Sequence, residues 1–323
     1  MKKVFFGSIF LALFVLPAFG NVLLAASKNL KIAMVLWRGE TKAEKGFQDG
    51  LKELGYSAKY TVMNAGQDRA ELGRLLREEL KPKLDEFNYI YIFGTTATQA
   101  TRTIVQDKVP QIFNIVADPV GAGIIGSLES PGGNISGASN EIPLPLQIQT
   151  ALKIISFKRL GLLFNPREKN SMLVRDKLSE ITKQFRFEVI DLRSPPAQDM
   201  LQENLQKLRD KSVVVDAVYL PPDSFLVSNA KLIGSELKAA KVKSIGSIEG
   251  YIENGALVGV VPDYYELGKA AATIVHRHQG GQKLKDIAVQ TAKEPVLLIN
   301  KTTSQALNIN IPEGLLGKAI IVE

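Results

Sequence analysis

Residues 92–102 read IFGTTATQATR and combine residue types that suit the binding of a small anion. An apolar run ends at Gly94, hydroxyl side chains follow at Thr95, Thr96 and Thr98, and a helical pattern begins there. The first N–H groups of a helix have no partner within the helix, and its positive end attracts negative charge. We therefore expect this segment to bind a carboxylate. A phosphate would also fit, although no GxxxxGK(S/T) pattern accompanies it, and simple helix capping is the alternative.

Polar residues also follow the other predicted strands, at the ends where open parallel sheets bind ligands. These residues are Trp37, Arg38, Asp118, Asn165, Asp223 and Glu249. Two lobes facing each other would direct them into one cleft, where Asp118 and Asp223 would offer negative charge to an ammonium group. Taken singly, each could instead be a turn former or a helix cap, and Asp118 could fix the turn that begins at Pro119.

Other chemistries have less support. Residues 121–126 match the dinucleotide pattern GxGxxG, but they follow the fourth predicted strand and no acidic residue lies at the expected offset, so we reject that interpretation.

His276 and His278 stand two apart on a predicted helix and point to different sides, which disfavours a shared metal or a catalytic triad; we expect both to be exposed. Asp118 and Asp223 could in principle act in hydrolysis, but binding explains them more simply. We expect no enzyme activity, no metal and no cofactor.

The elements that would position these residues alternate between strand and helix. In the first half we predict strands at 30–37, 57–65, 88–94 and 110–118, and helices at 41–56, 69–85 and 97–107. Apolar residues recur on one face of each of the first two helices, and Gly55 suits a left-handed helix end. This βαβα repetition predicts a parallel sheet covered by helices.

A segment rich in Gly, Ser, Asn and Pro, residues 133–145, separates this half from a second one in which the alternation restarts. Here we predict strands at 159–165, 186–192, 217–223, 242–248, 256–263 and 294–300, and helices at 171–185, 197–210, 229–240 and 264–278. The fold class is α/β, with two doubly wound parallel-sheet lobes joined by a multi-crossover hinge. We place residues 27–139 and about 264–287 in the first lobe, and residues 140–263 and about 288–323 in the second. The hinge crossings would lie near 138–142 and 288–296.

The start of the chain carries two lysines, a long apolar run and small residues, which predicts a secretory signal peptide over residues 1–26 with cleavage after Gly20 or Ala26. A retained membrane anchor is the alternative.

Loss of Lys2 and Lys3 lowers the net charge from +7 to +5, and no long basic run points to nucleic acid. The chain has no cysteine, hence no lipid-modified cysteine and no thiolate zinc site. We expect an exported, periplasmic protein that is not lipid-tethered.

Five motifs together carry a family resemblance: DPVGAGIIGSLESPGGNISG (118–137), LLFNPREKNS (162–171), DAVYLPPDS (216–224), DYYELGKAAA (263–272) and LLINKTTSQALNINIPEGLL (297–316). In order and spacing they resemble the ABC-transporter substrate-binding family that includes tryptophan- and tyrosine-type binding proteins. The resemblance implies a type I periplasmic binding fold, a ligand that is an amino acid or similar small carboxylate, and a membrane permease and ATPase as partners. Residues 143–157 and the loop LWRGETKAE (36–44) depart from the family's pattern, and the resemblance implies that this loop contacts the ligand.

We take the protein to be a monomeric solute-binding protein of an importer, with a sensor component that feeds a membrane receptor or kinase as the alternative. The candidate ligand-binding residues lie in the loops named above. They are Trp37, Arg38, Glu40, Gly94, Thr95, Thr96, Thr98, Ala117, Asp118, Pro119, Asn165, Asn170, Ser171, Asp223, Ser224 and Glu249.

Overall fold

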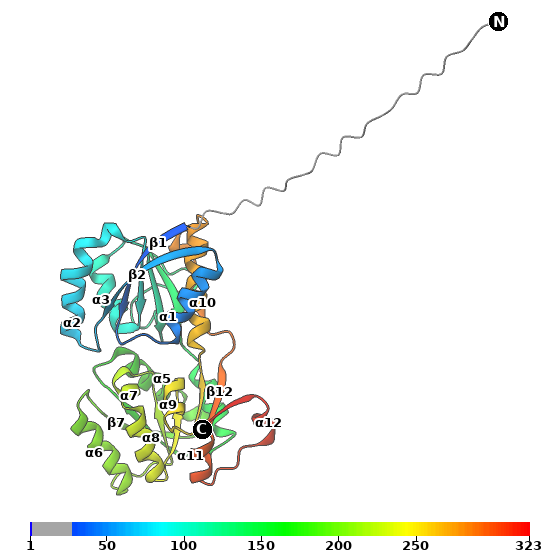
Figure 1. The fold of residues 1–323 in the computed structure, drawn as a ribbon. Helices are drawn as coiled ribbons and strands as arrows, with labels where there is room; N and C mark the ends of the chain where they lie inside the picture. Colours follow the sequence, from blue (N-terminus) through cyan, green and yellow to red (C-terminus); the bar gives the residue numbers. More distant parts are fainter. Residues whose placement is uncertain (2–27) are drawn as a thin grey trace.

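The computed structural model describes Met1 and residues 28–323, and these residues form two α/β lobes placed end to end (Figure 1). Apart from Met1, the predicted signal peptide lies outside the described residues. None of the helices within residues 28–323 combines the length and apolar character needed to cross a membrane.

The central strands of the first sheet are buried, as expected for a parallel sheet with helices on both faces. β3 (Tyr89–Phe93) and β4 (Gln111–Val116) are buried along their whole length. Around them lie β1 (Lys28–Leu36), β2 (Tyr56–Asn64), β5 (Ile135–Ser139) and β11 (Gln290–Thr291). The order is β11-β5-β4-β3-β1-β2, and all neighbouring pairs are parallel.

Two helices of the first lobe pack against each other at unusually short range. α1 (Lys42–Glu53) begins with a capping box between Thr41 and Glu44, and Gly55 just beyond its end has a φ of 84°, as the sequence predicts. α10 (Tyr264–Gln279) lies alongside α1. A Cβ on Gly46 would lie 2.0 Å from the Tyr265 carbonyl oxygen, so only glycine permits this approach. α3 (Thr95–Val105) follows β3.

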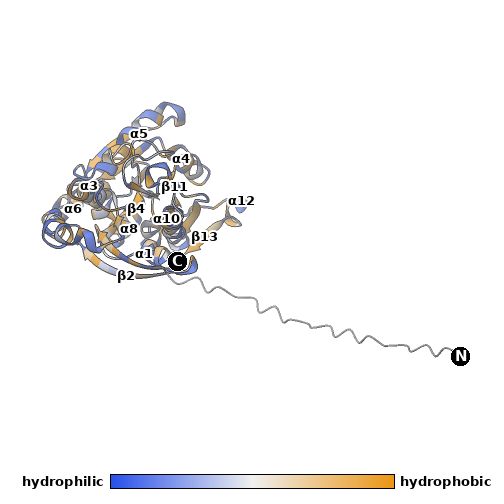
Figure 2. Ribbon diagram, turned by 90° about the horizontal axis from the view of Figure 1, so that it is seen from above, coloured by the Kyte–Doolittle hydropathy of each residue, from blue (hydrophilic) through white to orange (hydrophobic). Residues whose placement is uncertain are grey.

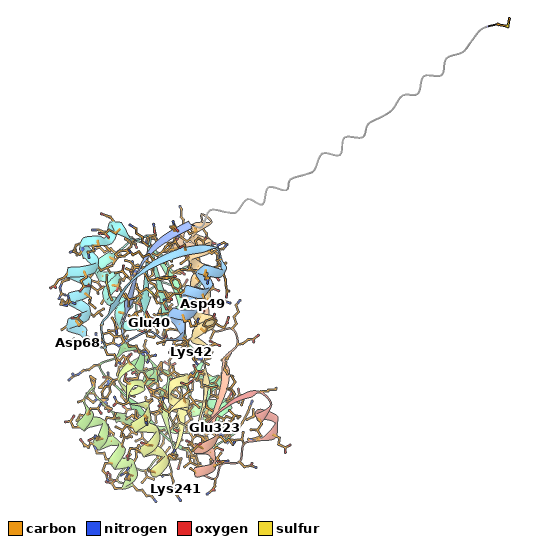
Figure 3. All side chains as sticks on the ribbon, in the orientation of Figure 1. Glu40, Lys42, Asp49, Asp68, Lys241 and Glu323 are labelled. Carbon is orange, nitrogen blue, oxygen red and sulfur yellow. The ribbon has the colours of Figure 1, made fainter. Side chains whose placement is uncertain are left out.

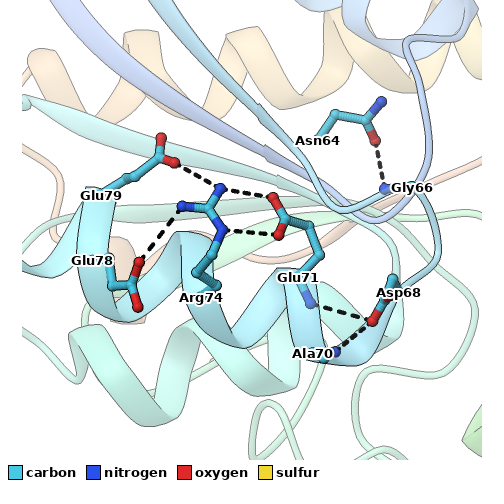
Figure 4. A network of polar contacts seen from close by, with 8 residues as sticks. All are labelled: Asn64, Gly66, Asp68, Ala70, Glu71, Arg74, Glu78 and Glu79. Carbon is cyan, nitrogen blue, oxygen red and sulfur yellow. Dashed lines mark hydrogen bonds and ion pairs between the residues drawn. The ribbon is translucent and has the colours of Figure 1, made fainter.

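The predicted helix over residues 69–85 is interrupted in the structure. Asp68 caps α2 (Arg69–Arg74), a π-helical turn follows at Leu75–Leu80, and a 3-10 turn at Lys81–Glu86 ends the segment. Arg74 contacts the carboxylates of three glutamates along this segment (Figure 4). The change of helix type is explained by Pro82, because proline has no N–H to continue the α-helical hydrogen bonds.

The second sheet contains seven strands in the order β13-β12-β10-β9-β8-β6-β7. They are β6 (Arg159–Phe164), β7 (Glu188–Arg193), β8 (Ala217–Leu220), β9 (Lys243–Gly246), β10 (Val258–Val261), β12 (Val296–Asn300) and β13 (Ala319–Val322). β12 pairs antiparallel with β10, and the other pairs are parallel. Apolar residues concentrate in the strands, and polar residues on the outer helices (Figure 2).

The helices of the second lobe alternate with these strands, as the sequence predicts. They are α4 (Leu144–Leu152), α5 (Lys169–Phe185), α6 (Gln198–Arg209), α7 (Ser224–Ser228), α8 (Ala230–Ala239), α9 (Glu249–Glu253), α11 (Lys301–Ala306) and α12 (Glu313–Leu316). The chain crosses between the lobes after β5, between β10 and α10, and between β11 and β12.

Two sequence expectations near the crossings need correction. The segment 133–145, interpreted as a separator, contains β5, which is fully buried in the first sheet. Within it, Gly137 cannot carry a side chain, because a Cβ there would lie 2.1 Å from the Phe113 carbonyl oxygen. Gln290–Thr291, expected in the second lobe, pairs with β5 as an edge strand of the first sheet. The other lobe limits stay predictions.

Candidate ligand-binding site

A cavity with an empty volume of about 370 Å³ lies between the lobes, at the carboxyl ends of strands from both sheets. The first lobe and the adjoining crossing contribute Arg38, Phe93, Gly94, Thr95, Ile115, Ala117 and Asn140. The second lobe contributes Glu168, Asn170, Pro222, Asp223, Ser224, Val227 and Ile248, and Tyr264 comes from the start of α10. Both lobes therefore supply polar groups to one enclosed space.

The start of α3 opens onto this cavity. Gly94 has a φ of 90°, a conformation that favours glycine, and α3 begins at Thr95 without a side-chain cap. The Thr98 hydroxyl instead donates to the Gly94 carbonyl oxygen at 2.8 Å and is fully buried, so it stabilises the turn. Thr96 is buried but does not line the cavity. The helix start itself remains available to an anion.

Arg38 brings a positive charge to the same lobe. Its guanidinium lies 5.3 Å from the centre of the Phe93 ring, and its buried Nε has no hydrogen-bond partner among the described residues. Trp37 does not line the cavity; it is buried in the core of the first lobe, with Arg69 5.9 Å from its ring centre. A buried donor without a partner is costly, so Arg38 is suited to an acceptor that arrives with a ligand.

A strained residue lies nearby on β4. Ile115 has a φ of 55° at an irregularity in the pairing of β4 with β5. A β-branched residue is strongly disfavoured at positive φ, and such strain gathers at functional sites. The Asn114 side chain accepts a hydrogen bond from the Ile115 N–H at 2.9 Å and thereby supports this conformation.

Two buried carboxyl groups face the cavity from the second lobe. Asp223 accepts hydrogen bonds from the Asn165 N–H at 2.9 Å, the Ser171 hydroxyl at 2.6 Å and the Leu226 N–H at 3.0 Å. Asn165 and Ser171, both candidates from the sequence, thus position Asp223 and do not line the cavity themselves.

Glu168 is the second carboxyl group, and sequence reasoning missed it. Its two oxygens accept hydrogen bonds from the Ser224 N–H and hydroxyl, each at 3.0 Å. Burial and the negative charge of Asp223 raise the pKa of Glu168 to about 8, and burial also raises the pKa of Asp223. Both carboxyl groups therefore hold a proton more readily than exposed carboxyl groups do.

Asp118 has a different environment from the one expected. Its carboxylate pairs with Lys177 at 2.7 Å and accepts from the Gly121 N–H at 2.7 Å, while Lys177 also pairs with Glu141 at 2.6 Å. Partial burial acts to raise the pKa of Asp118, but these hydrogen bonds outweigh it, and the pKa is lowered. Residues 119–124 form turns and no helix begins there, so the GxGxxG match lacks its structural context. Asp118 fixes this turn and joins the lobes.

Glu249 and Glu40 lie on the open side of the cavity. Glu249 pairs with Lys42 across the lobe boundary at 2.7 Å, and Figure 3 shows Glu40 and Lys42 at that boundary. Gln67 also donates to the Ser228 hydroxyl at 2.6 Å, which adds a second contact between lobes. The lobes are therefore in a closed arrangement.

Of the candidates from the sequence, those that line the cavity are Arg38, Gly94, Thr95, Ala117, Asn170, Asp223 and Ser224. Those that do not are Trp37, Glu40, Thr96, Thr98, Asp118, Pro119, Asn165, Ser171 and Glu249. The lining residues that sequence reasoning missed are Phe93, Ile115, Asn140, Glu168, Pro222, Val227, Ile248 and Tyr264. Several of these missed residues stand next to a candidate in the sequence. The ends of the predicted strands were therefore the signal that pointed to the cavity.

No cluster of three or more His, Cys, Asp or Glu that could hold a metal is found in the described part of the chain. The histidines on α10 differ from expectation, since only His276 is exposed. Its Nδ1 lies 3.0 Å from the Tyr56 hydroxyl, and the Nδ1 of half-buried His278 lies 2.6 Å from that of Tyr89. Both therefore join α10 to the first sheet.

Comparison with known proteins identifies the family. The family model described as ABC transporter substrate binding protein matches residues 32–322. The chain belongs to this family. A tyrosine-binding protein of Clostridioides difficile (strain R20291) is 30% identical over 288 residues, covering 87% of this chain and 81% of that protein.

Solved structures of the same kind agree in fold. An ABC domain from Streptococcus pneumonia in complex with L-Trp is 26% identical, with a TM-score of 0.82, and the match covers 92% of this chain and 100% of that one. A conserved domain protein from Vibrio cholerae matches with the same identity, TM-score and coverage. This member of the ABC transporter substrate-binding family thus has two α/β lobes of the periplasmic binding type I fold, as the sequence predicts.

Proposed function

We propose that this protein binds an amino acid with an aromatic side chain in the cavity between its lobes and passes it to an ABC importer. The observation that carries the proposal is the arrangement of charge: a positive group and a helix start on one lobe face two acidic groups on the other. An amino acid has the complementary pair of charges, and binding sites for charged ligands commonly match such pairs.

The carboxylate end of the ligand would lie against the first lobe. Arg38 offers its Nε, which lacks a partner among residues 28–323, and the uncapped start of α3 offers backbone N–H groups. Both groups are donors, as a carboxylate requires.

The ammonium end would lie against the second lobe. Glu168 and Asp223 supply negative charge, and the Oδ1 atoms of Asn140 and Asn170 are buried acceptors that find no donor within the described chain. The Nδ2 of Asn170, a residue that lines the cavity, donates to the Pro222 carbonyl oxygen, and its Oδ1 is left as a free acceptor among the described residues. An ammonium group has three N–H donors and would satisfy these acceptors.

The aromatic class of ligand is supported by similarity. One relative is named for tyrosine and one similar structure holds L-Trp. The apolar part of the cavity wall, which includes Phe93, Ile248 and Tyr264, suits a large side chain. We further propose that the protein is exported, acts as a monomer and delivers its ligand to a membrane permease powered by an ATPase.

A thermal-shift screen tests the proposal, because a ligand that binds only the folded state raises its stability. The screen covers the standard amino acids and small carboxylates, and we expect L-tryptophan or L-tyrosine to raise the unfolding temperature most. If no amino acid raises it, the proposal is wrong.

Calorimetry on variants then tests the site. Arg38→Met should weaken binding of the best amino acid at least about thirtyfold, because truncation of one partner of a desolvated charge pair costs roughly 2 to 5 kcal/mol. Arg77→Met is the matched control, since Arg77 is exposed in the π-helical turn away from the cavity. Equal affinities for the two variants would contradict the site.

A further inference from the structure

The end of the second lobe that lies away from the ligand cavity carries an excess of positive charge. β6, β7, β8 and β9 are parallel neighbours in the sheet, so the chain enters all four strands at this end. Figure 3 shows Lys241 there, away from the lobe boundary where Lys42 lies. We call the four segments that precede these strands the basic end; they are residues 153–159, 183–188, 207–216 and 236–243.

The basic end holds more positive charge than the described chain as a whole. Its four segments contain eleven lysines and arginines and four acidic residues, a net charge of +7. The chain without Lys2 and Lys3 has a net charge of +5, so the rest of the protein is net negative. A local concentration of one sign of charge attracts surfaces of the opposite sign.

Helix dipoles do not account for this excess. Lysine and arginine are favoured where helices end, and α5, α6 and α8 end here. In the first lobe, α1, the turn at Lys81–Glu86 and α3 end at the corresponding place, before β2, β3 and β4. There, residues 52–56, 81–88 and 106–110 contain as many acidic as basic residues. The excess is therefore particular to the second lobe.

Most cations of the basic end are exposed, whereas two of its acidic groups are engaged by the chain. Asp216 accepts hydrogen bonds from the N–H groups of Lys158 and Arg159, each at 2.8 Å. Glu236 pairs with Arg209. Six exposed cations make no ion pair within residues 28–323: Lys153, Lys158, Lys183, Arg186, Lys211 and Lys241. Their charges are available to an anionic partner.

An exposed aliphatic side chain stands among these cations. Val214 is 47% exposed and belongs to the loop before β8, whose neighbours in the sheet are β6 and β9. A bilayer with anionic headgroups offers phosphates to the cations and an apolar layer to such a side chain. A nucleic acid commonly adds stacking on aromatic side chains, but none of the three phenylalanines of the basic end is exposed.

We propose that the basic end binds the surface of a membrane that contains anionic phospholipids. Each lysine or arginine close to such a surface adds attraction, so six exposed cations act together. The ligand cavity lies at the opposite end of the same sheet, and the membrane would not cover it. The chain has no cysteine to carry a lipid, and this contact would hold the protein at the membrane without one. The inference does not depend on which ligand the cavity binds.

Co-sedimentation with vesicles tests the inference. The protein purified from the exported fraction is mixed with vesicles of phosphatidylcholine, or of phosphatidylcholine with phosphatidylglycerol, in about 0.1 M salt. We expect binding to the anionic vesicles only, and its loss at about 1 M salt, where charges are screened beyond about 3 Å. Equal binding to both kinds of vesicle, or binding to neither, would overturn the inference.

A charge-reversal variant tests which surface binds. The triple variant Lys158→Glu, Lys211→Glu, Lys241→Glu should bind anionic vesicles at least about tenfold more weakly than the parent. Circular dichroism checks that it folds. If it does not fold, the three single reversals replace it, and each should weaken binding at least about twofold.

The matched control makes the same change of net charge on the first lobe. It is the triple variant Lys52→Glu, Lys81→Glu, Lys108→Glu, at exposed positions of the charge-balanced loops, and it should bind within threefold of the parent. Equal weakening by the two triple variants would show that net charge alone decides binding and would overturn the inference. A parent that binds a DNA duplex but not anionic vesicles would overturn it too.

Discussion

At the scale of single residues, the two acidic groups of the second lobe have separate tasks. Asp223 receives three hydrogen bonds from the chain and joins the loop after β6 to the start of α7. Glu168 receives hydrogen bonds from the Ser224 N–H and hydroxyl and is also buried. We therefore propose that Glu168 contacts the ammonium group of the ligand and that Asp223 adds negative charge beside it.

The raised pKa of Glu168 predicts how stability depends on pH without ligand. Between the ordinary value of 4.5 and about 8, the folded protein binds a proton that the unfolded chain has released. Stability should therefore fall as pH rises through this window, by at most about 1.4 kcal/mol per pH unit. Glu168→Gln should remove much of this fall and unfold at a higher temperature than the parent at pH 8.

Thermal unfolding followed by circular dichroism from pH 5 to pH 8 checks this expectation. Glu180→Gln, on an exposed position of α5, is the control and should keep the parental slope. A Glu168→Gln protein whose stability falls as steeply as that of the parent would mean that Glu168 is already ionised at pH 5.

The sequence predicted part of the site because strand ends are visible in it. Gly94, Thr95 and Asp223 follow apolar runs, and all three line the cavity. The tasks of individual side chains were not predictable, because they depend on contacts between distant residues. Ser171 is 52 residues from Asp223 in the chain, and Lys177 is 59 residues from Asp118. Glu168 was missed because a charged residue in a loop is usually solvated.

At the scale of elements, the contact between α1 and α10 connects two parts of the chain that are more than two hundred residues apart. α10 returns from the second lobe to the first, and Gly46 and Gly268 allow the two backbones to touch. The sequence predicted both helices, the first of them from its apolar face. It did not predict β5, whose residues ISGAS lack a strong apolar pattern; at Gly137 a Cβ would meet the Phe113 carbonyl oxygen of β4.

Gly268→Ala should destabilise the protein by about 1 to 3 kcal/mol, because the new Cβ would lie 2.1 Å from the Ala43 carbonyl oxygen and the helices would have to separate. Urea unfolding measures the change. Gly314→Ala is the control, since nothing lies within 4 Å of its added Cβ, and it should leave stability unchanged or slightly higher. Equal stability of both variants would contradict the close packing.

At the scale of the whole molecule, the proposed function assigns one end of the ligand to each lobe. Ion pairs cross the boundary between the lobes, such as Lys42 with Glu249 and Lys177 with Asp118. These pairs are partly exposed and each contributes little, so a ligand that binds both lobes would dominate closure. A molecule that has only the carboxylate or only the ammonium group should make charged contacts with one lobe and none with the other.

Calorimetry with truncated ligands tests this central claim most directly. L-tryptophan is compared with tryptamine, which lacks the carboxylate, and with indole-3-propionate, which lacks the amine. If L-tyrosine binds more tightly, it is used instead. Its truncated counterparts are tyramine and 3-(4-hydroxyphenyl)propionate. We predict that each truncated molecule binds at least about thirtyfold more weakly than the amino acid, because one buried charged group of the protein is left without its partner. Binding of either truncated molecule within threefold of the amino acid would contradict recognition of both ends by opposite lobes.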